Sequence, residues 1–179
     1  MSPEWPLETE RLVLRPYEAD DFDLLYRLQS DPEVVKWLYN DTRDEAETRT
    51  LLQRKVAGGE LREEGDWLAC VAVADAPVGD VSFHWVSREH RTGEIGFMFD
   101  PRTQGRGYAT EAARALVDWA FGAGFHRVIG RTEARNVASA RVLEKLGMRL
   151  EGRLVENEWV KDEWQSELQY AILEHEWAA

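Results

Sequence analysis

The chain has 179 residues, which suits one domain, since a chain of this length buries well over half of its unfolded surface without metal or disulfide support. Its 34 acidic and 22 basic side chains give a net charge of −12. This disfavours nucleic-acid binding and is compatible with a cationic partner, although surplus acid also serves solubility alone. The single cysteine, Cys70, excludes an intramolecular disulfide and fits a reducing compartment. Because the start is not leader-like and no apolar run reaches membrane-spanning length, we expect a cytoplasmic protein with no membrane partner.

In chain order, a strand comes first, followed by two helices, of which Asp31-Pro32 ends the first and Gly58-Gly59 the second. Three runs rich in β-branched and aromatic residues then predict strands, the first two joined as a hairpin. In the third run, Ile95 and its alternate neighbours form one face, while Glu94 lies on the other. These elements are a strand at 12–15, helices at 20–28 and 44–56, and strands at 67–74, 78–85 and 92–99.

The second half begins with the clearest helix of the chain, an unbroken i, i+3, i+4 apolar stripe from Ala109 to Phe121. A strand, a shorter helix stopped by Gly147, and two last strands follow. This order predicts an α/β fold in a single domain, residues 1–179, with a mixed sheet and helices on both faces. These later elements are expected at 109–121, 128–132, 136–146, 149–156 and 164–173.

The segment from Gln104 to Thr110 lies between a strand and the strongest helix, where an anion is expected to bind. Its glycines let a ligand approach the backbone, the first helical N–H groups lack partners, and the helix dipole favours negative charge. Arg102 and Arg106 add positive charge nearby. A P-loop string is absent, and a dinucleotide fingerprint would need a third glycine and a parallel βαβ unit. The sequence therefore predicts a phosphate-bearing ligand of another kind.

Gln104-x-x-Gly107-x-Ala109 resembles the acetyl-CoA pyrophosphate motif of the GNAT acetyltransferase superfamily, in its place between the fourth strand and the third helix. Four further segments resemble the ribosomal-protein N-terminal acetyltransferase (Rim-type) branch of that superfamily, in the same order and at similar separations. The resemblance covers nearly the whole chain, from residue 8 to residue 173. The four segments are 9–15, 94–97, 110–112 and 136–148.

The resemblance implies a mostly antiparallel sheet of seven strands, whose fourth and fifth strands splay and hold the pantetheine arm of acetyl-CoA. It places backbone contacts to that arm on the fourth strand, the pyrophosphate on the glycine-rich turn, and Asn136 and Ser139 near the pantetheine and the sulfur. The branch often has an aspartate in the last strand, where this chain has Gln165-Ser166-Glu167. The residues assigned to the cofactor are Phe97, Met98, Phe99, Gln104, Gly105, Arg106, Gly107, Tyr108, Ala109, Thr110, Asn136 and Ser139.

Acetyl transfer to an amine needs the amine in its neutral form. An α-amino group with a pKa near 8 is roughly a tenth neutral at pH 7, whereas a lysine-like amine is only about 0.04% neutral and needs a positioned base. Glu94 is the preferred base, its alternative being an exposed charge opposite the core. Glu111 comes second, because a carboxylate near a helix start is also favoured by the dipole alone. Ser139 is the candidate acid for the leaving thiolate, unless it merely caps its helix.

The acceptor pocket is expected to be lined by Trp37, Tyr39 and Trp85, with core packing as the alternative for each. The four histidines and the cysteine lack metal-ligand spacing, so no metal is expected. The last two strands either form the seam of a homodimer, with Trp159 and Trp164 at the interface, or belong to a monomer that packs these residues internally.

The sequence thus predicts an acetyl-CoA-dependent N-acetyltransferase that acts on a primary amine by direct attack in a ternary complex. A protein or peptide N-terminus is the first acceptor, and a small-molecule amine or antibiotic is the alternative. The alternative from another functional class is a non-catalytic acyl-CoA-binding or sensor domain. The presence of Glu94, Asn136 and Ser139 disfavours this alternative. Transfer of a longer acyl group is a third reading.

Overall fold

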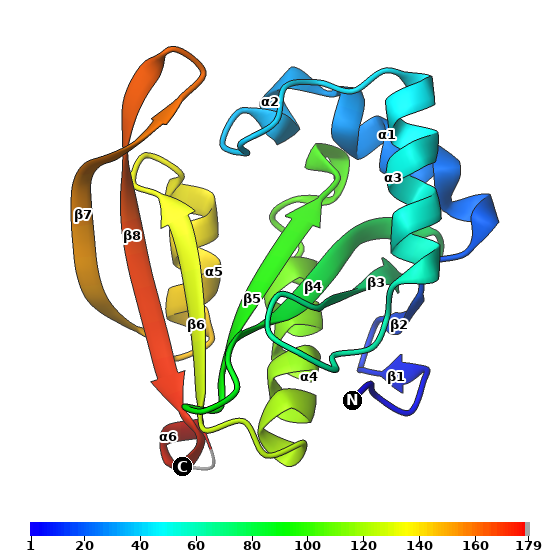
Figure 1. The fold of residues 1–179 in the computed structure, drawn as a ribbon. Helices are drawn as coiled ribbons and strands as arrows, with labels where there is room; N and C mark the ends of the chain where they lie inside the picture. The colour runs from blue at the N-terminus through cyan, green and yellow to red at the C-terminus, as the bar shows by residue number, and fades with distance from the viewer. Residues whose placement is uncertain (178–179) are drawn as a thin grey trace.

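The structure, a computed structural model, describes residues 1–177, in which eight strands form one mixed sheet with helices on both faces (Figure 1). The strand order is β1-β2-β3-β4-β5-β6-β8-β7. The strands are β1 Leu7–Glu8, β2 Val13–Pro16, β3 Trp67–Val73, β4 Pro77–Ser87, β5 Thr92–Phe99, β6 Arg127–Glu133, β7 Arg149–Val160 and β8 Glu163–Leu173. The helices are α1 Phe22–Ser30, α2 Pro32–Val35, α3 Glu45–Ala57, α4 Tyr108–Gly122, α5 Val137–Lys145 and α6 Glu174–Trp177, with 3-10 turns η1 Ala19–Asp21 and η2 Pro101–Thr103.

The sheet matches the predicted fold class and has one strand more than expected. The additional strand is the two-residue β1, where Leu7 pairs with Leu14 of β2 at the edge of the sheet. An element this short carries no recognisable hydrophobic period in the sequence. The strands and helices that the sequence predicted all form, in the predicted order, with ends that differ by a few residues.

The strands β5 and β6 are the only parallel neighbours among the described residues, and they pair over a short stretch. Their pairing ends at Glu94 and Ile129. Beyond that point β5 pairs only with β4, and β6 only with β8. Figure 1 shows the two strands diverging toward the end of the sheet where α2 lies. The splayed pair expected from the family resemblance is therefore confirmed.

Two hydrophobic clusters cover the two faces of the sheet. The larger cluster lies between the sheet and the helices α4 and α5, and the smaller one lies between the opposite face and the helices α1 and α3. Alternate residues of β5 divide between them, since Ile95 belongs to the larger cluster and Met98 packs against the smaller. The parity predicted for this strand is thus confirmed.

A buried ion pair joins α3 to β4 beneath the smaller cluster. Lys55 Nζ lies 2.7 Å from Asp80 Oδ2, which also accepts a 2.5 Å hydrogen bond from the Tyr17 hydroxyl. The side chains of Lys55 and Asp80 are 8% and 6% exposed. The Lys55 ammonium also lies over the rings of Tyr17 and Trp67. This polar cluster fixes how α3 sits on the sheet.

Cys70 lies in the middle of β3 and has no exposed surface. Burial raises the pKa of its thiol to about 12.

At the β7 edge of the sheet, Trp159 and Trp164 pair edge-to-face across the β7–β8 hairpin and are each 57% exposed. They are not packed internally. Within residues 1–177, none of the helices combines the length and the apolar character needed to span a bilayer.

Candidate active site

Two adjoining cavities lie where β5 and β6 part. The larger one, which we call the groove, has a volume of about 560 Å³, and the smaller one, which we call the pocket, about 290 Å³. Trp37 and Leu38, in the loop after α2, line both cavities. The pocket is lined by Glu94, the last residue of β5 that pairs with β6, together with residues of β6 that lie beyond this pairing. The parting of two strands therefore opens both cavities.

Eleven of the twelve residues that the sequence assigned to a cofactor line the groove. They come from the end of β5, from the glycine-rich turn and first residues of α4, and from the start of α5. The exception is Arg106, which is exposed and does not line the groove. Local sequence thus identified the part of the groove that a strand end, a continuous turn and two helix starts form.

The backbone of the turn depends on its glycines. Gly105 and Gly107 have φ values of 77° and 84°, in the left-handed region that strains residues with a Cβ. A Cβ on Gly105 would meet no protein atom within 4 Å, and one on Gly107 would meet only Arg11 Nη2, at 3.3 Å. Gly107 is the N-cap of α4, so the first amides of the helix lack intrahelical acceptors. The turn is open and rich in donors, as an anion-binding site requires, and its glycines adopt the left-handed conformation without strain.

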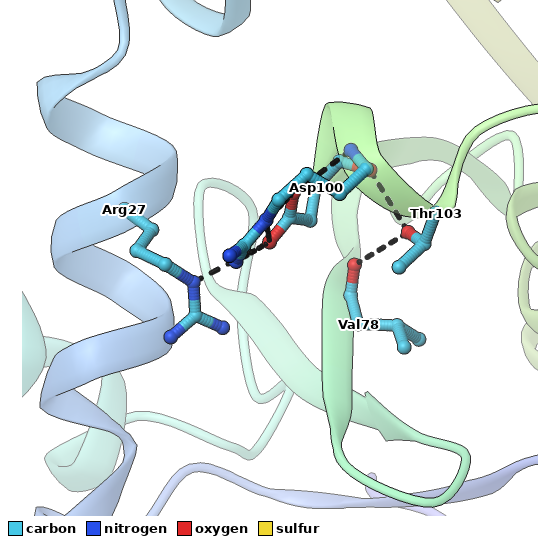
Figure 2. A network of polar contacts seen from close by, with 5 residues as sticks. Arg27, Val78, Asp100 and Thr103 are labelled. Atoms are coloured by element: carbon cyan, nitrogen blue, oxygen red, sulfur yellow. Dashed lines mark hydrogen bonds and ion pairs between the residues drawn. The ribbon is translucent and has the colours of Figure 1, made fainter.

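The segment before the turn is fixed by Asp100, which is 4% exposed. Figure 2 shows its carboxylate accepting a hydrogen bond from Arg27 Nε, while the Thr103 hydroxyl donates to the carbonyl oxygens of Asp100 and Val78. The carboxylate also accepts a hydrogen bond from Arg102 Nε at 2.9 Å. The bonds from Arg102 lower the pKa of Asp100 to about 2, against the opposing effect of burial. The Arg102 charge, which the sequence analysis counted as positive charge near the turn, is therefore paired within the protein.

Glu111 lines neither cavity, so the structure does not support it as a base. Its carboxylate accepts hydrogen bonds from the Thr9 hydroxyl at 2.7 Å and from the backbone N–H and Nε of Arg11, each at 2.8 Å. Arg11 Nη1 in turn donates to the carbonyl oxygen of Arg106 at 2.9 Å. Glu111 thereby holds Arg11 against the turn. The partner lies 100 residues away, which is why the sequence pattern could not reveal this role.

The helix α5 contributes a cap, a hydroxyl and two cations to the groove. The Asn136 side chain accepts a hydrogen bond from the Ser139 N–H at 3.2 Å and so caps the helix. Arg141 and Lys145 also line the groove and were missed in the sequence. Their i, i+4 spacing places both on one face of the helix that carries Ser139, and this pattern could have predicted them from the sequence. These two cations suit the phosphates of a coenzyme.

The pocket is acidic and has an aromatic rim. Trp37 and Tyr39 line it as expected, Tyr39 being 70% exposed. Trp85 does not line it, so this expectation is wrong. Trp85 is 6% exposed, and its ring centroid lies 4.0 Å from that of Phe125 in the core. Its neighbour His84 faces the pocket instead, since successive side chains of a strand point to opposite faces.

Glu94 lines the pocket and is held by two neighbours. Its Oε2 accepts hydrogen bonds from Arg131 Nε at 3.0 Å and Nη2 at 2.7 Å, and lies 3.4 Å from His84 Nε2. Burial favours the neutral acid, but the bonds from His84 and Arg131 outweigh it and lower the pKa of Glu94. Glu94 is therefore ionised at neutral pH and is a weak base. Arg131 and His84 were not predicted for the site, because only the register of β4, β5 and β6 brings them to Glu94.

Glu167, on β8, also lines the pocket and is 7% exposed. Burial, together with the charges of Glu158 and Glu94, raises its pKa, against the effect of Arg131. The sequence had marked this position only as a departure from the family pattern. Within residues 1–177, no group of three or more histidine, cysteine or acidic side chains is arranged to hold a metal ion.

Comparison with known proteins agrees with this geometry. Residues 11–149 match the family described as Acetyltransferase (GNAT) domain. The chain belongs to the GNAT acetyltransferases. A curated relative, an uncharacterized N-acetyltransferase (YnaD) of Bacillus subtilis, is 33% identical over 96% of this chain and 98% of its own length. As an N-acetyltransferase of this family, the protein has a groove in the place that the family motif predicted.

Solved GNAT structures share the whole fold. An acetyltransferase of Bacillus anthracis is 32% identical and superposes with a TM-score of 0.86 over 96% of this chain and 99% of that chain. A spermidine N-acetyltransferase of Vibrio cholerae, solved with CoA and spermine, is 19% identical with a TM-score of 0.80, covering 96% of this chain and all of that chain. At that identity the second likeness concerns the fold alone.

Proposed function

We propose that this N-acetyltransferase moves the acetyl group of acetyl-CoA to a primary amine of a small, cationic molecule, by direct attack in a ternary complex. The observation that carries the proposal is the meeting of two cavities of unlike chemistry at Trp37 and Leu38. A donor-rich groove adjoins an acidic pocket at the point where β5 and β6 part. A thioester and an amine can therefore be held side by side in one site.

The groove fits acetyl-CoA on its own features. The glycine-rich turn leaves its amides open toward a pyrophosphate, and Arg141 and Lys145 supply cations to a ligand with further phosphates. When bound there, acetyl-CoA supplies the activated acetyl group. Ser139, which lines the same groove, would donate a proton to the departing thiolate.

The pocket favours a small cationic acceptor. Four carboxylates belong to its lining. Among the described residues that line the pocket, Arg131 is the only arginine or lysine. The four are Glu94, Glu133, Glu158 and Glu167. An amine that carries a second positive charge gains a further contact with such a lining. The V. cholerae spermidine N-acetyltransferase, which shares the fold, agrees with an acceptor of this class. Because the sequence contains Rim-type motifs, a protein N-terminus is the second candidate acceptor.

The donor assignment is tested by isothermal titration with acetyl-CoA. The Gly107→Trp variant should fold and lose binding, because a bulky side chain on a left-handed N-cap fills the turn. Gly124→Trp, just beyond the other end of α4, is the matched control, since Gly124 is also left-handed, with a φ of 93°, and a Cβ there meets no atom within 4 Å. If wild type binds neither acetyl-CoA nor longer acyl-CoAs, the donor assignment is wrong.

The acceptor assignment is tested with a panel of n-butylamine, 1,4-diaminobutane, spermine, an aminoglycoside and a peptide with a free N-terminus, with the acetylated product measured by mass spectrometry. We expect kcat/KM for the diamine to exceed that for the monoamine by about tenfold, the effect of one additional charged contact. A preference for the peptide would restore the N-terminal acceptor. Binding of acetyl-CoA without any acetylated product would instead support a non-catalytic acyl-CoA-binding domain.

A further inference from the structure

We propose that Glu167, and not Glu94, accepts the proton that the acceptor amine loses before it attacks the thioester. This inference rests on the proposed function and names the residue that makes its amine reactive. A small amine resembling lysine is almost entirely protonated at pH 7, so an N-acetyltransferase acting on one needs a base inside the pocket.

The position of Glu167 suits this role. It lies on β8, directly across from Glu133 of β6 and Leu154 of β7, and it lines the pocket. The residue is 7% exposed, yet within residues 1–177 no side chain or backbone group donates a hydrogen bond to its carboxylate. These unpartnered oxygens open into the pocket, since the buried side-chain nitrogen or oxygen that lacks a partner among the described residues is Trp85 Nε1. Such a group is expected where a ligand completes its bonding.

The other carboxylates of the pocket are less suited. Arg131 and His84 occupy Oε2 of Glu94, and the Arg135 Nε lies 2.8 Å from Oε1 of Glu133. Hydrogen bonds and opposite charges of this kind favour the ionised form and so weaken a base. Glu158 is half-buried, and the Tyr39 hydroxyl donates a hydrogen bond to its carboxylate. Glu167 is thus the carboxylate whose proton affinity is least reduced by partners.

Several charged or titratable groups surround Glu167 from the neighbouring elements. Burial is the main cause that raises the pKa of Glu167; the charge of Arg131, which is bonded to Glu94, lowers it, and the charges of Glu158 and Glu94 raise it further. A base of raised pKa takes a proton from an ammonium more readily, because the two affinities lie closer together. The groups that face the pocket are His84 of β4, Glu94 of β5, Arg131 and Glu133 of β6, Glu158 of β7, and Tyr39 of the loop after α2.

The step balances in protons and electrons. One N–H proton of the ammonium passes to the Glu167 carboxylate, and the freed lone pair of nitrogen forms the C–N bond at the thioester carbonyl carbon. The C–S bond breaks with its electron pair on sulfur, and a second proton from nitrogen ends on that sulfur, relayed through the Ser139 hydroxyl. Glu167 then releases its proton to water. Glu94 remains ionised throughout and keeps Arg131 in place.

The test compares Glu167→Gln with Glu94→Gln, Glu158→Gln and the exposed surface control Glu60→Gln, using 1,4-diaminobutane as acceptor. We expect E167Q to lower kcat at pH 7 by about 100-fold or more, the usual effect of losing a general base. The KM for acetyl-CoA should change by less than about threefold, because Glu167 does not line the groove. In E94Q the loss should fall mainly on the KM for the amine, because Arg131 becomes mobile.

The pH profile separates a base from a structural residue. In E167Q, kcat should rise about tenfold per pH unit from pH 7 to pH 9, as the fraction of neutral amine grows, and E167D should recover part of the activity. A merely destabilised variant would show neither effect. An E167Q enzyme within threefold of wild type, or the same pH signature in E94Q or E158Q instead, would overturn the assignment.

A failure of the proposed function is visible separately, since wild type would then bind acetyl-CoA and acetylate no amine of the panel. In that case, isothermal titration with 1,4-diaminobutane still tests the contact between Glu167 and the amine. Binding that is weakened about tenfold or more in E167Q, and unchanged in E60Q, supports the contact. Equal affinity in wild type and E167Q overturns it.

Discussion

Replacing Lys55 by methionine removes the cation from the ion pair buried between α3 and β4, and leaves the carboxylate of Asp80 without its ammonium partner. Because both side chains are less than a tenth exposed, the cost is that of an uncompensated buried charge, about 3–5 kcal/mol of the free energy of unfolding. In a chain of this length, about 1 kcal/mol shifts Tm by about 2–4 °C, so Tm should fall by roughly 6–20 °C. The double variant K55M/D80N should recover most of this loss, since asparagine carries no charge and still accepts the Tyr17 hydroxyl bond.

The assay is urea unfolding followed by tryptophan fluorescence, which reports on this region because Lys55 lies over the Trp67 ring. Glu60→Gln serves as control, because its ion pair with Arg62 is exposed and is expected to contribute less than about 1 kcal/mol. The reasoning is refuted if K55M costs no more than this control, or if the double variant is no more stable than K55M.

Three further predictions concern the groove and its supports. Glu111→Ala should release Arg11 from the turn and weaken acetyl-CoA binding about fivefold with kcat unchanged, as titration and kinetics would show; a fall in kcat alone would return Glu111 to a catalytic role. Gly130→Ala places a methyl group 2.4 Å from the Leu143 side chain and should cost about 1–3 kcal/mol in urea unfolding, whereas a neutral result would mean that α5 shifts freely. Asp100, with a folded-state pKa of about 2 against an ordinary 3.8, contributes stability at neutral pH that is lost as the pH falls from about 4 to 2. Allowing for screening, this amounts to about 1 kcal/mol, so Asp100→Asn should lose less stability than wild type between pH 7 and pH 3, and equal losses would contradict the assignment.

The parts of this protein that the sequence predicts well depend on neighbours along the chain. The apolar stripe of α4 and the glycine-rich turn before it are local patterns, and glycine is the residue that permits the left-handed conformation found at Gly107. The sequence could therefore place the part of the groove that comes from the end of β5, the turn and the two helix starts, whereas the part that comes from α2 and the loop after it depends on the fold.

The pocket could be predicted only in part, because strand register and distant partners decide it. Trp85 and His84 are adjacent in sequence, and the pattern does not say which of the two faces the core. Glu111 resembled a catalytic carboxylate until its distant partner Arg11 was placed. Glu167 gained its character from burial beside β6 and β7, which no period in the last strand reveals.

The burial of Cys70 has a practical consequence for measuring this enzyme. Aromatic disulfide reagents, which report released CoA by reacting with its thiol, require an accessible thiolate. The only thiol of the native protein lies inside β3 with a pKa of about 12 and a sulfur close to the carbonyl of Val81, so it presents almost no thiolate to solvent. Turnover can therefore be followed continuously with such a reagent at high enzyme concentration, where slow amines become measurable. The same reagent labels the protein only once it unfolds, so a rising background marks loss of the native state.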